Sequence, residues 1–199
     1  MNLLMNIKIK QAYCFQNLMV KVNIPQWRQV LKSAQIKEGN TYSSKWMQLA
    51  TTNEKNEPRL RTVVFREWKN NTSMIIFTDK RTKKVRDIEL NKNVEILWLF
   101  FKSKSQFRFK GNAELIPDKI DYWNKLSAKS KEKWYWPHPG KKRNNEDFNN
   151  NLISSNPPEN FLIIQINLEI IELLKLSQPF HKRYSWQKDH NWERTELNP

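Results

Sequence analysis

The stretch WMQLATTNEKNEPRLRTVVFREW, residues 46–68, predicts a β-hairpin. Residues 46–52 and 59–68 contain many of the β-branched and aromatic side chains that favour strands, and the polar segment NEKNEP between them is typical of a turn. Pro58 has no backbone N–H to donate to a sheet, so it marks the beginning of the second strand. The sequence therefore predicts an antiparallel pair of strands at residues 46–52 and 59–68.

Further short strands follow this hairpin, whereas helical spacing of apolar residues occurs in only a few segments. Residues 106–110 alternate between polar and aromatic side chains, and Gly111 after them permits a bend or a β-bulge. Residues 94–101 are apolar on both faces, which is typical of a buried central strand. The pattern predicts a mainly β fold, an antiparallel β-barrel with flanking helices. Strands are expected at 46–52, 59–68, 73–78, 94–101, 106–110, 161–166, 170–176, 183–187 and 192–197, and helices at 26–36, 82–90 and 118–136.

Length and composition fit one folded domain. A chain of 199 residues can bury roughly 70% of its unfolded surface in a single core, so we expect one domain over residues 21–199 behind a leader at 1–20. No apolar run approaches the roughly 20 residues of a membrane span. The single cysteine, Cys14, cannot form an internal disulfide, which favours a cytoplasmic protein. Three histidines are too few for a structural zinc site.

The charge balance indicates an anionic partner. Lysine and arginine number 35 against 20 aspartates and glutamates, a net charge of +15 that attracts polyanions, acidic surfaces or a phosphorylated ligand. Neither GxGxxG nor GxxxxGK[ST] occurs in the sequence, so the known glycine-rich phosphate loops are excluded. A phosphate would have to be held by side chains and helix ends.

Positive charge is densest in DKRTKKVR, residues 79–86, at the beginning of a predicted helix that Asp79 or Thr82 would cap. Each cation at a helix N-terminus destabilises the helix by about 0.3–1 kcal/mol unless an anion compensates. A bound phosphate dianion would make the interaction of these cations with the site favourable. A solvated basic face explains the same residues without a ligand, so both interpretations stay open.

Three arginines on the preceding strand, Arg59, Arg61 and Arg66, could reach the same ligand. Residues 61 and 66 differ by an odd number, so in a regular strand their side chains face opposite ways. For Arg61 and Arg66 to contact one ligand, a β-bulge or a strand end would have to lie between them. Either arginine could otherwise be a surface residue.

Four segments, in this order, resemble the pyridoxamine 5'-phosphate oxidase-like FMN-binding proteins, whose fold is a split β-barrel. The similarity is strongest to the cyanobacterial and plant-type branch, which also has PxPG after the long helix and ends in LNP. It runs from about residue 46 to residue 199 and implies FMN as the cofactor. The segments are PRLRTVVFR (58–66), IFTDKRTKK (76–84), QFRFKG (106–111) and HKRYSWQKDHNWERTELNP (181–199).

The resemblance also implies a set of cofactor-binding residues. Arg61, Lys83 and Lys84 match residues that hold the FMN phosphate, and Phe77 with Thr78 matches a pair that lines the flavin.

Other matching positions lie near the flavin ring. Arg66 stands where the family usually has a lysine near flavin and substrate. Gln106 matches a glutamine at the isoalloxazine ring, and Arg183 matches a C-terminal arginine that reaches the cofactor. In this family the site forms between two subunits, which implies a homodimer.

The substrate side resembles the family less closely. Tyr122, Ser130 and His181 match substrate-binding residues, but Leu126 and Pro179 stand where arginines are expected. Leu174 likewise replaces a tryptophan beside the flavin. Losing two cations from a phosphate pocket could cost several kcal/mol, because each charge-assisted hydrogen bond contributes roughly 1.5–3 kcal/mol. A phosphorylated small-molecule substrate is therefore expected, but pyridoxamine phosphate itself is in doubt.

Three functions are consistent with these observations. The first is an FMN-dependent oxidoreductase in which the flavin takes a hydride from the substrate. The second is an FMN-binding protein without oxidase activity, such as a carrier, a sensor or a reductase of another substrate. The third is a basic nucleic-acid-binding module, suggested by the charge and by KWYWPHPGKK, residues 133–142, and it predicts a purified protein without flavin absorption.

Overall fold

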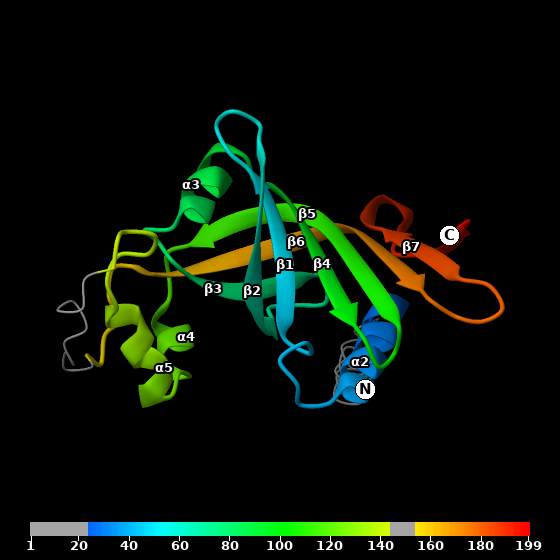
Figure 1. The fold of residues 1–199 in the computed structure, drawn as a ribbon, viewed down its shortest axis with the longest axis horizontal. Coiled ribbons are helices and arrows are strands. Elements are labelled where there is room, and N and C mark those ends of the chain that lie inside the picture. The colour runs from blue at the N-terminus through cyan, green and yellow to red at the C-terminus, as the bar shows by residue number, and fades with distance from the viewer. Residues whose placement is uncertain (1–23, 144–153) are drawn as a thin grey trace, which may run out of the picture.

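The computed structural model describes residues 24–143 and 154–199, and their strands form one eight-stranded antiparallel sheet. The strands follow the order β3-β2-β1-β4-β5-β6-β7-β8, and pairing of β3 with β6 closes the first six into a barrel (Figure 1). The expected mainly β barrel with flanking helices is confirmed. The leader expected at residues 1–20 lies outside the described residues. The strands are β1 (Trp46–Thr52), β2 (Pro58–Trp68), β3 (Ser73–Asp79), β4 (Asn93–Phe100), β5 (Ser105–Ile116), β6 (Phe161–Lys175), β7 (Lys182–Gln187) and β8 (Arg194–Leu197).

Two irregularities bend the sheet. The register of β5 on β6 shifts between Lys110 and Gly111, at the glycine where the sequence allows a bulge. A Cβ atom at residue 111 would lie 2.2 Å from the carbonyl oxygen of Asn167, so the approach of β6 requires glycine there. The second shift lies between Phe65 and Glu67 on β2, opposite β3.

The barrel interior is filled by inward side chains of the six barrel strands, β1 to β6. On β4 the inward residues Val94, Ile96 and Trp98 are buried, whereas the outward Leu97 and Leu99 are partly exposed. The expectation that this strand is buried on both faces is therefore wrong for the single chain. Its outer face is covered only in part.

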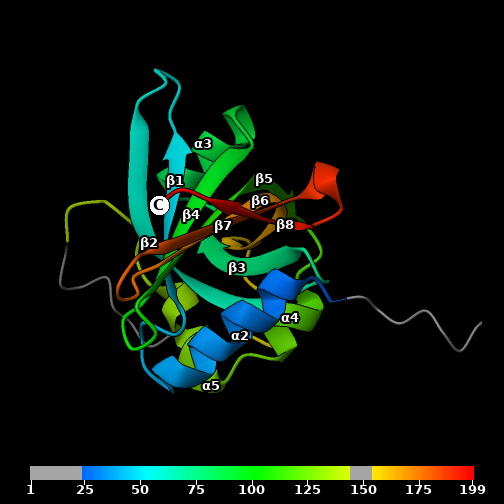
Figure 2. The same ribbon diagram turned by 90° about the vertical axis from the view of Figure 1, so that its right-hand side faces the viewer.

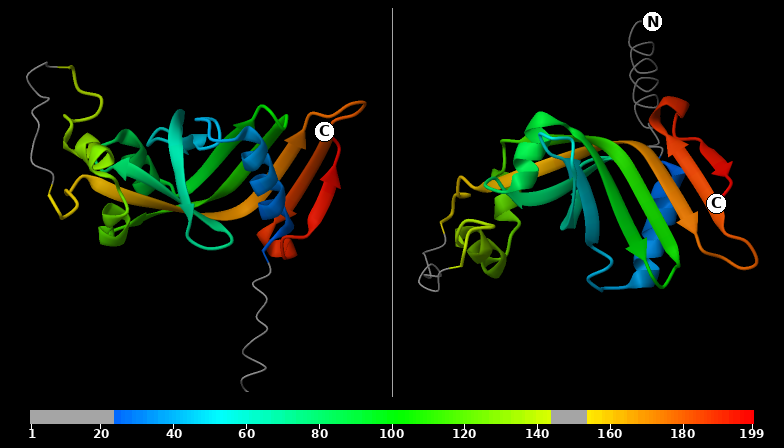
Figure 3. Two further views of the ribbon diagram at one scale, coloured as in Figure 1. Left: turned by 90° about the horizontal axis from the view of Figure 1, so that it is seen from below. Right: turned by 45° about the horizontal axis from the view of Figure 1, so that its top comes forward.

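Helices lie at the two ends of the barrel. Helix α2 packs Trp27, Leu31 and Ala34 into the core near one end, and α4 and α5 lie at the other end of the long axis (Figures 1 and 3). The strands β7 and β8 extend the sheet past β6, beyond the closed barrel (Figure 2). No helix in residues 24–143 and 154–199 is long and apolar enough to cross a membrane. The helices are α2 (Gln26–Glu38), α3 (Lys83–Leu90), α4 (Ile120–Asn124) and α5 (Ala128–Glu132), with short 3-10 turns η1 (Lys133–Tyr135) and η3 (Lys188–His190).

Predicted elements differ from the structure at three places, and one predicted helix cap is not formed. The long helix expected at 118–136 is broken, because the Ser127 side chain accepts a hydrogen bond from the Ser130 N–H and so begins a new helix. The strands expected at 161–166 and 170–176 are one strand, β6, which continues through a bulge: Lys110 and Gly111 of β5 pair with Ile170 and Leu168, so Glu169 is the extra residue. The last strand begins at Arg194 rather than Trp192, whose positive φ of 60° places it in a turn. Thr82 does precede α3, but its hydroxyl donates to the Asp79 carbonyl instead of capping the helix.

Candidate functional site

Lys84, in the first turn of α3, turns its ammonium group toward the sheet. Its Nζ donates to Thr78 Oγ1 at 3.0 Å and to Thr82 Oγ1 at 3.1 Å. Burial lowers the pKa of Lys84, and the positive charge of Arg61 lowers it further, while Asp79 opposes the shift. Within the described part of the chain no carboxylate lies at ion-pair distance from this ammonium group. A bound anion would supply the missing counter-charge.

A buried carboxylate, Asp87, ties α3 to the β1–β2 hairpin. Arg59 Nη1 donates to Oδ1 at 3.0 Å, and Arg61 Nη2 donates to Oδ2 at 3.3 Å. The Thr51 hydroxyl donates to Oδ2 at 2.7 Å and accepts from Arg61 Nη1 at 2.7 Å. Burial lowers the pKa of Arg61, and Asp87 offsets part of that shift.

The balance of charge at this place is positive. Arg59 and Arg61 share the one carboxylate of Asp87, and Lys84 has no carboxylate at ion-pair distance among the described residues, so a phosphate dianion could balance the remaining positive charge. The first-turn N–H groups of α3 lie at the same end of the helix and also favour an anion. The role of Asp87 was missed from the sequence. The sequence feature that could have indicated it is the position of Asp87, an acidic residue three positions after Lys84 in a helix that otherwise begins with basic residues.

The other cations of residues 79–86 do not converge with Lys84. Lys80, Lys83 and Arg86 are exposed, because successive helical positions point in different directions around the axis. Arg81 is held by Asp79, whose Oδ2 lies 2.6 Å from its Nη2. Lys83, expected at the phosphate, therefore lies next to the site with its side chain in solvent.

Arg66 and Phe77 form the neighbouring part of the site. Phe65 pairs with Ile76 and Glu67 pairs with Ile75, so Arg66 is the extra residue of the β2 bulge. The bulge supplies the irregularity that Arg61 and Arg66 would need to serve one site. The guanidinium carbon of Arg66 lies 5.0 Å from the Phe77 ring centroid, and burial lowers the Arg66 pKa.

The substrate candidates are distributed over two places. Tyr122 of α4 is 8% exposed and packs edge-on against Phe77 with the ring centroids 5.7 Å apart. Ser130 of α5 instead accepts a hydrogen bond from the Ser127 hydroxyl at 3.0 Å. His181 lies elsewhere, where its Nδ1 is 3.3 Å from the Ser177 carbonyl oxygen.

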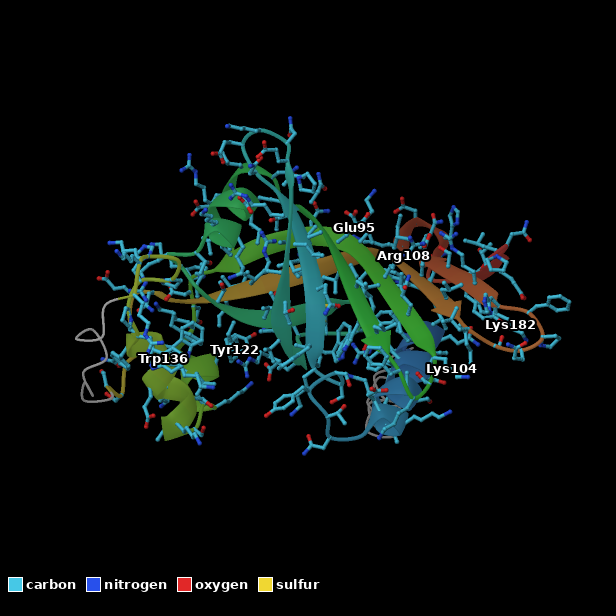
Figure 4. All side chains as sticks on the ribbon, viewed as in Figure 1. Glu95, Lys104, Arg108, Tyr122, Trp136 and Lys182 are labelled. Atoms are coloured by element: carbon cyan, nitrogen blue, oxygen red, sulfur yellow. The ribbon has the colours of Figure 1, made fainter. Side chains whose placement is uncertain are left out.

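Gln106 and His181 line an open groove of about 760 Å³ on the outer face of β4, β5 and β6. Lys104 belongs to this groove, and in Figure 4 it lies on the opposite side of the molecule from Tyr122. Apolar side chains provide most of the lining, among them Leu99, Phe101 and Leu174.

Arg183 lies beside this groove on β7. Its Nη2 donates to Glu172 Oε2 at 2.9 Å, and the same oxygen accepts a hydrogen bond from Arg108. The Nε of Arg183 is buried with no hydrogen-bond partner among the described residues. The predicted site residues thus form two separate groups on one chain, one around Lys84 and Phe77 and one around Gln106 and Arg183. The described residues hold no cluster of His, Cys, Asp and Glu that could bind a metal ion.

Known proteins resemble this chain in sequence. A family model described as pyridoxamine 5'-phosphate oxidase, FMN-binding domain, matches residues 24–117. Pyridoxine/pyridoxamine 5'-phosphate oxidase 2 of Arabidopsis thaliana is 29% identical over 168 residues, covering 77% of this chain and 85% of the plant protein. The pyridoxine/pyridoxamine 5'-phosphate oxidase of Crocosphaera subtropica is 31% identical over 91 residues, covering 46% of this chain and 40% of that protein.

Solved structures share the fold. A pyridoxamine 5'-phosphate oxidase-related FMN-binding protein of Nostoc punctiforme superposes with a TM-score of 0.80 at 27% identity, over 87% of this chain and 98% of that one. PhzG of Burkholderia lata, solved with tetrahydrophenazine-1-carboxylic acid, gives a TM-score of 0.74 at 17% identity, over 87% of this chain and 90% of that one. At such an identity the second likeness supports the split-barrel fold alone.

Proposed function

We propose that this chain, which is similar to the pyridoxamine 5'-phosphate oxidase-like FMN-binding proteins, is an FMN-dependent oxidoreductase acting on a phosphorylated small molecule. The observation that carries the proposal is the uncompensated positive charge around Lys84, next to Thr78 and Phe77. We also propose that residues 21–199 form one FMN-binding domain and that the protein is cytoplasmic.

The residues around Lys84 fit the phosphate of FMN. Lys84 and Arg61 would donate charge-assisted hydrogen bonds to its oxygens, and the Thr78 hydroxyl, already oriented by Lys84, would add a neutral one. Asp87 would keep Arg61 in place, since it bonds that guanidinium from the side of the helix. Lys83 would contribute mainly long-range attraction because its side chain is exposed.

The aromatic and cationic pair of Phe77 and Arg66 fits the ring system of the flavin. When bound, FMN supplies the hydride-accepting chemistry, which no side chain can provide. Phe77 would exclude water from one side of the ring, and the guanidinium of Arg66, an exposed residue whose guanidinium carbon lies 5.0 Å from the Phe77 centroid, would stabilise negative charge near it.

Gln106 and Arg183 would complete the site from a partner subunit. Their groove lies at the β4–β5 turn, on the other side of the barrel from α3, the helix that contains Lys84 (Figure 1), so one copy alone does not bring the two groups together. Apolar residues around the groove are unusually exposed: 67% for Phe101, 44% for Leu176 and 78% for Phe180. A second copy covering this face would bury them, which supports a homodimer with two shared sites.

Mixed dimers test the shared site. A Lys84→Met chain and a Gln106→Leu chain each damage both sites of their own homodimer. A heterodimer of the two contains one site with both changes and one site with neither. Co-purified heterodimers should therefore bind FMN at one site with wild-type affinity. Weak binding at both sites would contradict a site built from two subunits.

The function itself is tested by visible absorption of the purified protein with and without added FMN. A protein that takes up FMN and then forms pyridoxal phosphate and peroxide from pyridoxamine phosphate is an oxidase. FMN uptake without this turnover would support the second candidate, a flavin carrier, sensor or reductase, which Leu126, Leu174 and Pro179 favour. A protein that takes up no FMN would refute both.

A further inference from the structure

Three successive aromatic residues after α5 lie in different environments. Trp134 packs edge-on against Phe161 with the ring centroids 4.7 Å apart, and the Tyr135 and Trp123 rings meet edge-on at 6.5 Å. Trp134 and Tyr135 are therefore partly buried, whereas Trp136 is 53% exposed. Two of the three rings fix this segment on the body of the protein, and the third is presented at the surface.

Neighbouring segments hold the backbone on either side of the exposed ring. The Trp136 carbonyl oxygen accepts a hydrogen bond from Arg81 Nη2 at 3.1 Å, and Arg81 is paired with Asp79. Asn160 Nδ2 donates to the Trp134 carbonyl oxygen at 2.9 Å and to Asp79 Oδ2 at 3.0 Å. A side chain on a backbone held in this way loses less conformational freedom when a ligand binds, which favours affinity.

Four exposed lysines belong to the segments that meet at this place. Lys133, Lys141 and Lys142 lie on the same segment as Trp136, and Lys80 precedes the arginine that contacts its carbonyl group. Among the described residues, no carboxylate lies at ion-pair distance from any of these four lysines. Residues 125–143 contain seven lysines and arginines against one acidic residue, so the positive charge is local as well as overall.

A further cation, Lys119, adds to the charge of this region. Its Nζ donates to the carbonyl oxygens of Pro158, Glu159 and Phe161 at 2.7, 3.2 and 2.9 Å. Burial lowers the pKa of Lys119, and the positive charge of Lys80 lowers it further, while Glu159 opposes the shift. Lys80 and Lys119 therefore repel each other, and a bound anion would reduce that repulsion.

The combination of lysines with an exposed indole fits an anion that carries flat rings. Proteins that bind single-stranded nucleic acid combine a basic surface along the phosphates with aromatic side chains on which the bases stack. A membrane surface would instead require a broad apolar face. Helices α4 and α5 have five residues each, and over residues 119–143 the exposed large apolar side chains are Ile120 and Trp136 alone.

We propose that the basic surface formed by Lys80, Lys133, Lys141 and Lys142 around Trp136 binds single-stranded nucleic acid. The lysines contact phosphates, and a base stacks on the Trp136 indole. This is a second activity, and it uses none of the residues assigned to the flavin or its substrate. Figure 4 shows Trp136 beside α5, at the other end of the molecule from Lys104 and the groove. Because phosphate contacts and stacking do not distinguish the sugar, both RNA and DNA should bind.

The salt dependence of binding tests the lysines. The measurement is the fluorescence anisotropy of a labelled oligonucleotide of about 20 nucleotides, longer than one binding site, titrated with the full chain at several salt concentrations. Four phosphate contacts predict that the logarithm of the association constant falls by about 2.8 per tenfold rise in salt, since each contact contributes about 0.7. The double variant Lys141→Gln, Lys142→Gln should reduce this slope to about 1.4.

The matched control is Lys32→Gln with Lys37→Gln, which removes the same charge from exposed positions of α2, near the other end of the barrel. The control should leave the slope unchanged. An equal reduction in both double variants would show that net charge rather than this surface attracts the oligonucleotide, and would refute the proposal.

A second pair of variants tests the stacked base. Trp136→Ala should raise the dissociation constant for the oligonucleotide about 5- to 150-fold and leave that for heparin, a polyanion without bases, unchanged. Trp136→Phe, which keeps an aromatic ring, should restore most of the affinity. Trp46→Ala removes a tryptophan that is 46% exposed on β1, and as the control it should change neither constant. An equal loss of heparin binding in Trp136→Ala would show that the ring only supports the surface, and would overturn the stacking role.

Other polyanions complete the test. Tighter binding of duplex DNA than of either single strand would refute the proposal, because the bases of a duplex are stacked on one another. Binding of phosphatidylserine vesicles without binding of an oligonucleotide would replace it by a membrane contact. No saturable binding of RNA or DNA at about 0.15 M salt would also refute it. FMN uptake should be the same in every variant, and a wild type that takes up no FMN would refute the proposed function while leaving this test intact.

Discussion

Replacing Lys84 by methionine should weaken FMN binding by about 10- to 100-fold. The Lys84 ammonium is fixed 3.0 Å from Thr78 Oγ1 and 3.1 Å from Thr82 Oγ1, and it lacks a carboxylate partner within the described residues. A charge-assisted hydrogen bond to the phosphate contributes about 1.5–3 kcal/mol, and each 1.4 kcal/mol changes the dissociation constant tenfold. Methionine keeps a similar length and an apolar stem, so the fold should be retained.

The assay is quenching of FMN fluorescence on titration with apoprotein. Arg86→Met is the control, because it removes the same charge from the same helix at an exposed position. The control should change the dissociation constant less than about threefold, which is the size of a long-range electrostatic effect. Equal losses in the two variants would show that general charge, rather than a contact with Lys84, attracts FMN, and the site assignment would be wrong.

The same residue gives FMN binding a characteristic pH dependence. Burial and Arg61 lower the Lys84 pKa in the free protein, whereas a bound phosphate dianion would raise it. At a pH between the Lys84 pKa of the free protein and that of the complex, FMN binding is accompanied by proton uptake at Lys84. The affinity for FMN is therefore highest below the pKa of the free protein and falls as the pH rises through it. The fall should begin below the pH expected of an ordinary lysine. Titrations at increasing pH should show it in the wild type and lose it in Lys84→Met.

Two further variants test the fold and the second group of site residues. Gly111→Ala should destabilise the protein by about 3 kcal/mol and lower the melting temperature by about 6–12 °C, because its Cβ would meet the Asn167 carbonyl oxygen; an unchanged thermal scan would contradict the close approach. Glu172→Gln removes the carboxylate that holds Arg183, so FMN should bind several-fold more weakly and its absorption bands should shift. Glu114→Gln on β5 is the control, and identical spectra and affinities in both would refute a role for Glu172.

Local patterns predicted much of the barrel. The hairpin of β1 and β2 was predicted because its strands, its turn and Pro58 all indicate the same structure, and the register from Trp46–Val64 to Thr52–Pro58 confirms it. Gly111 was predicted at a bend for a similar local reason. The break at Ser127 was missed because the apolar spacing continues across it, while a single side-chain cap decides where the new helix begins. The closing pair of β3 and β6 joins residues far apart in sequence, and no local signal shows it.

The site was less accessible to sequence reasoning, because its geometry depends on an irregular strand. Alternation along β2 would separate Arg61 from Arg66, and the sequence contains no glycine or proline between them to mark a bulge. The bulge is seen only in the pairing with β3, where residues 65 and 67 have consecutive partners. The same irregularity places Glu67 against Lys125, a contact across 58 residues that composition and periodicity do not predict.

The cations of this protein differ in what is available to a ligand. Arg81 is paired with Asp79, which compensates its charge, whereas Arg183 shares the single carboxylate of Glu172 with Arg108. Within residues 24–143 and 154–199, Lys84 and Arg66 have no carboxylate at ion-pair distance; Lys84 is partly buried and Arg66 is exposed, and desolvation lowers the pKa of each. Removing a charge from water without compensation costs free energy, which a bound anion can recover. The net charge of +15 therefore indicates less about the ligand than these two residues, of which Lys84 contacts Thr78 and Arg66 contacts Phe77.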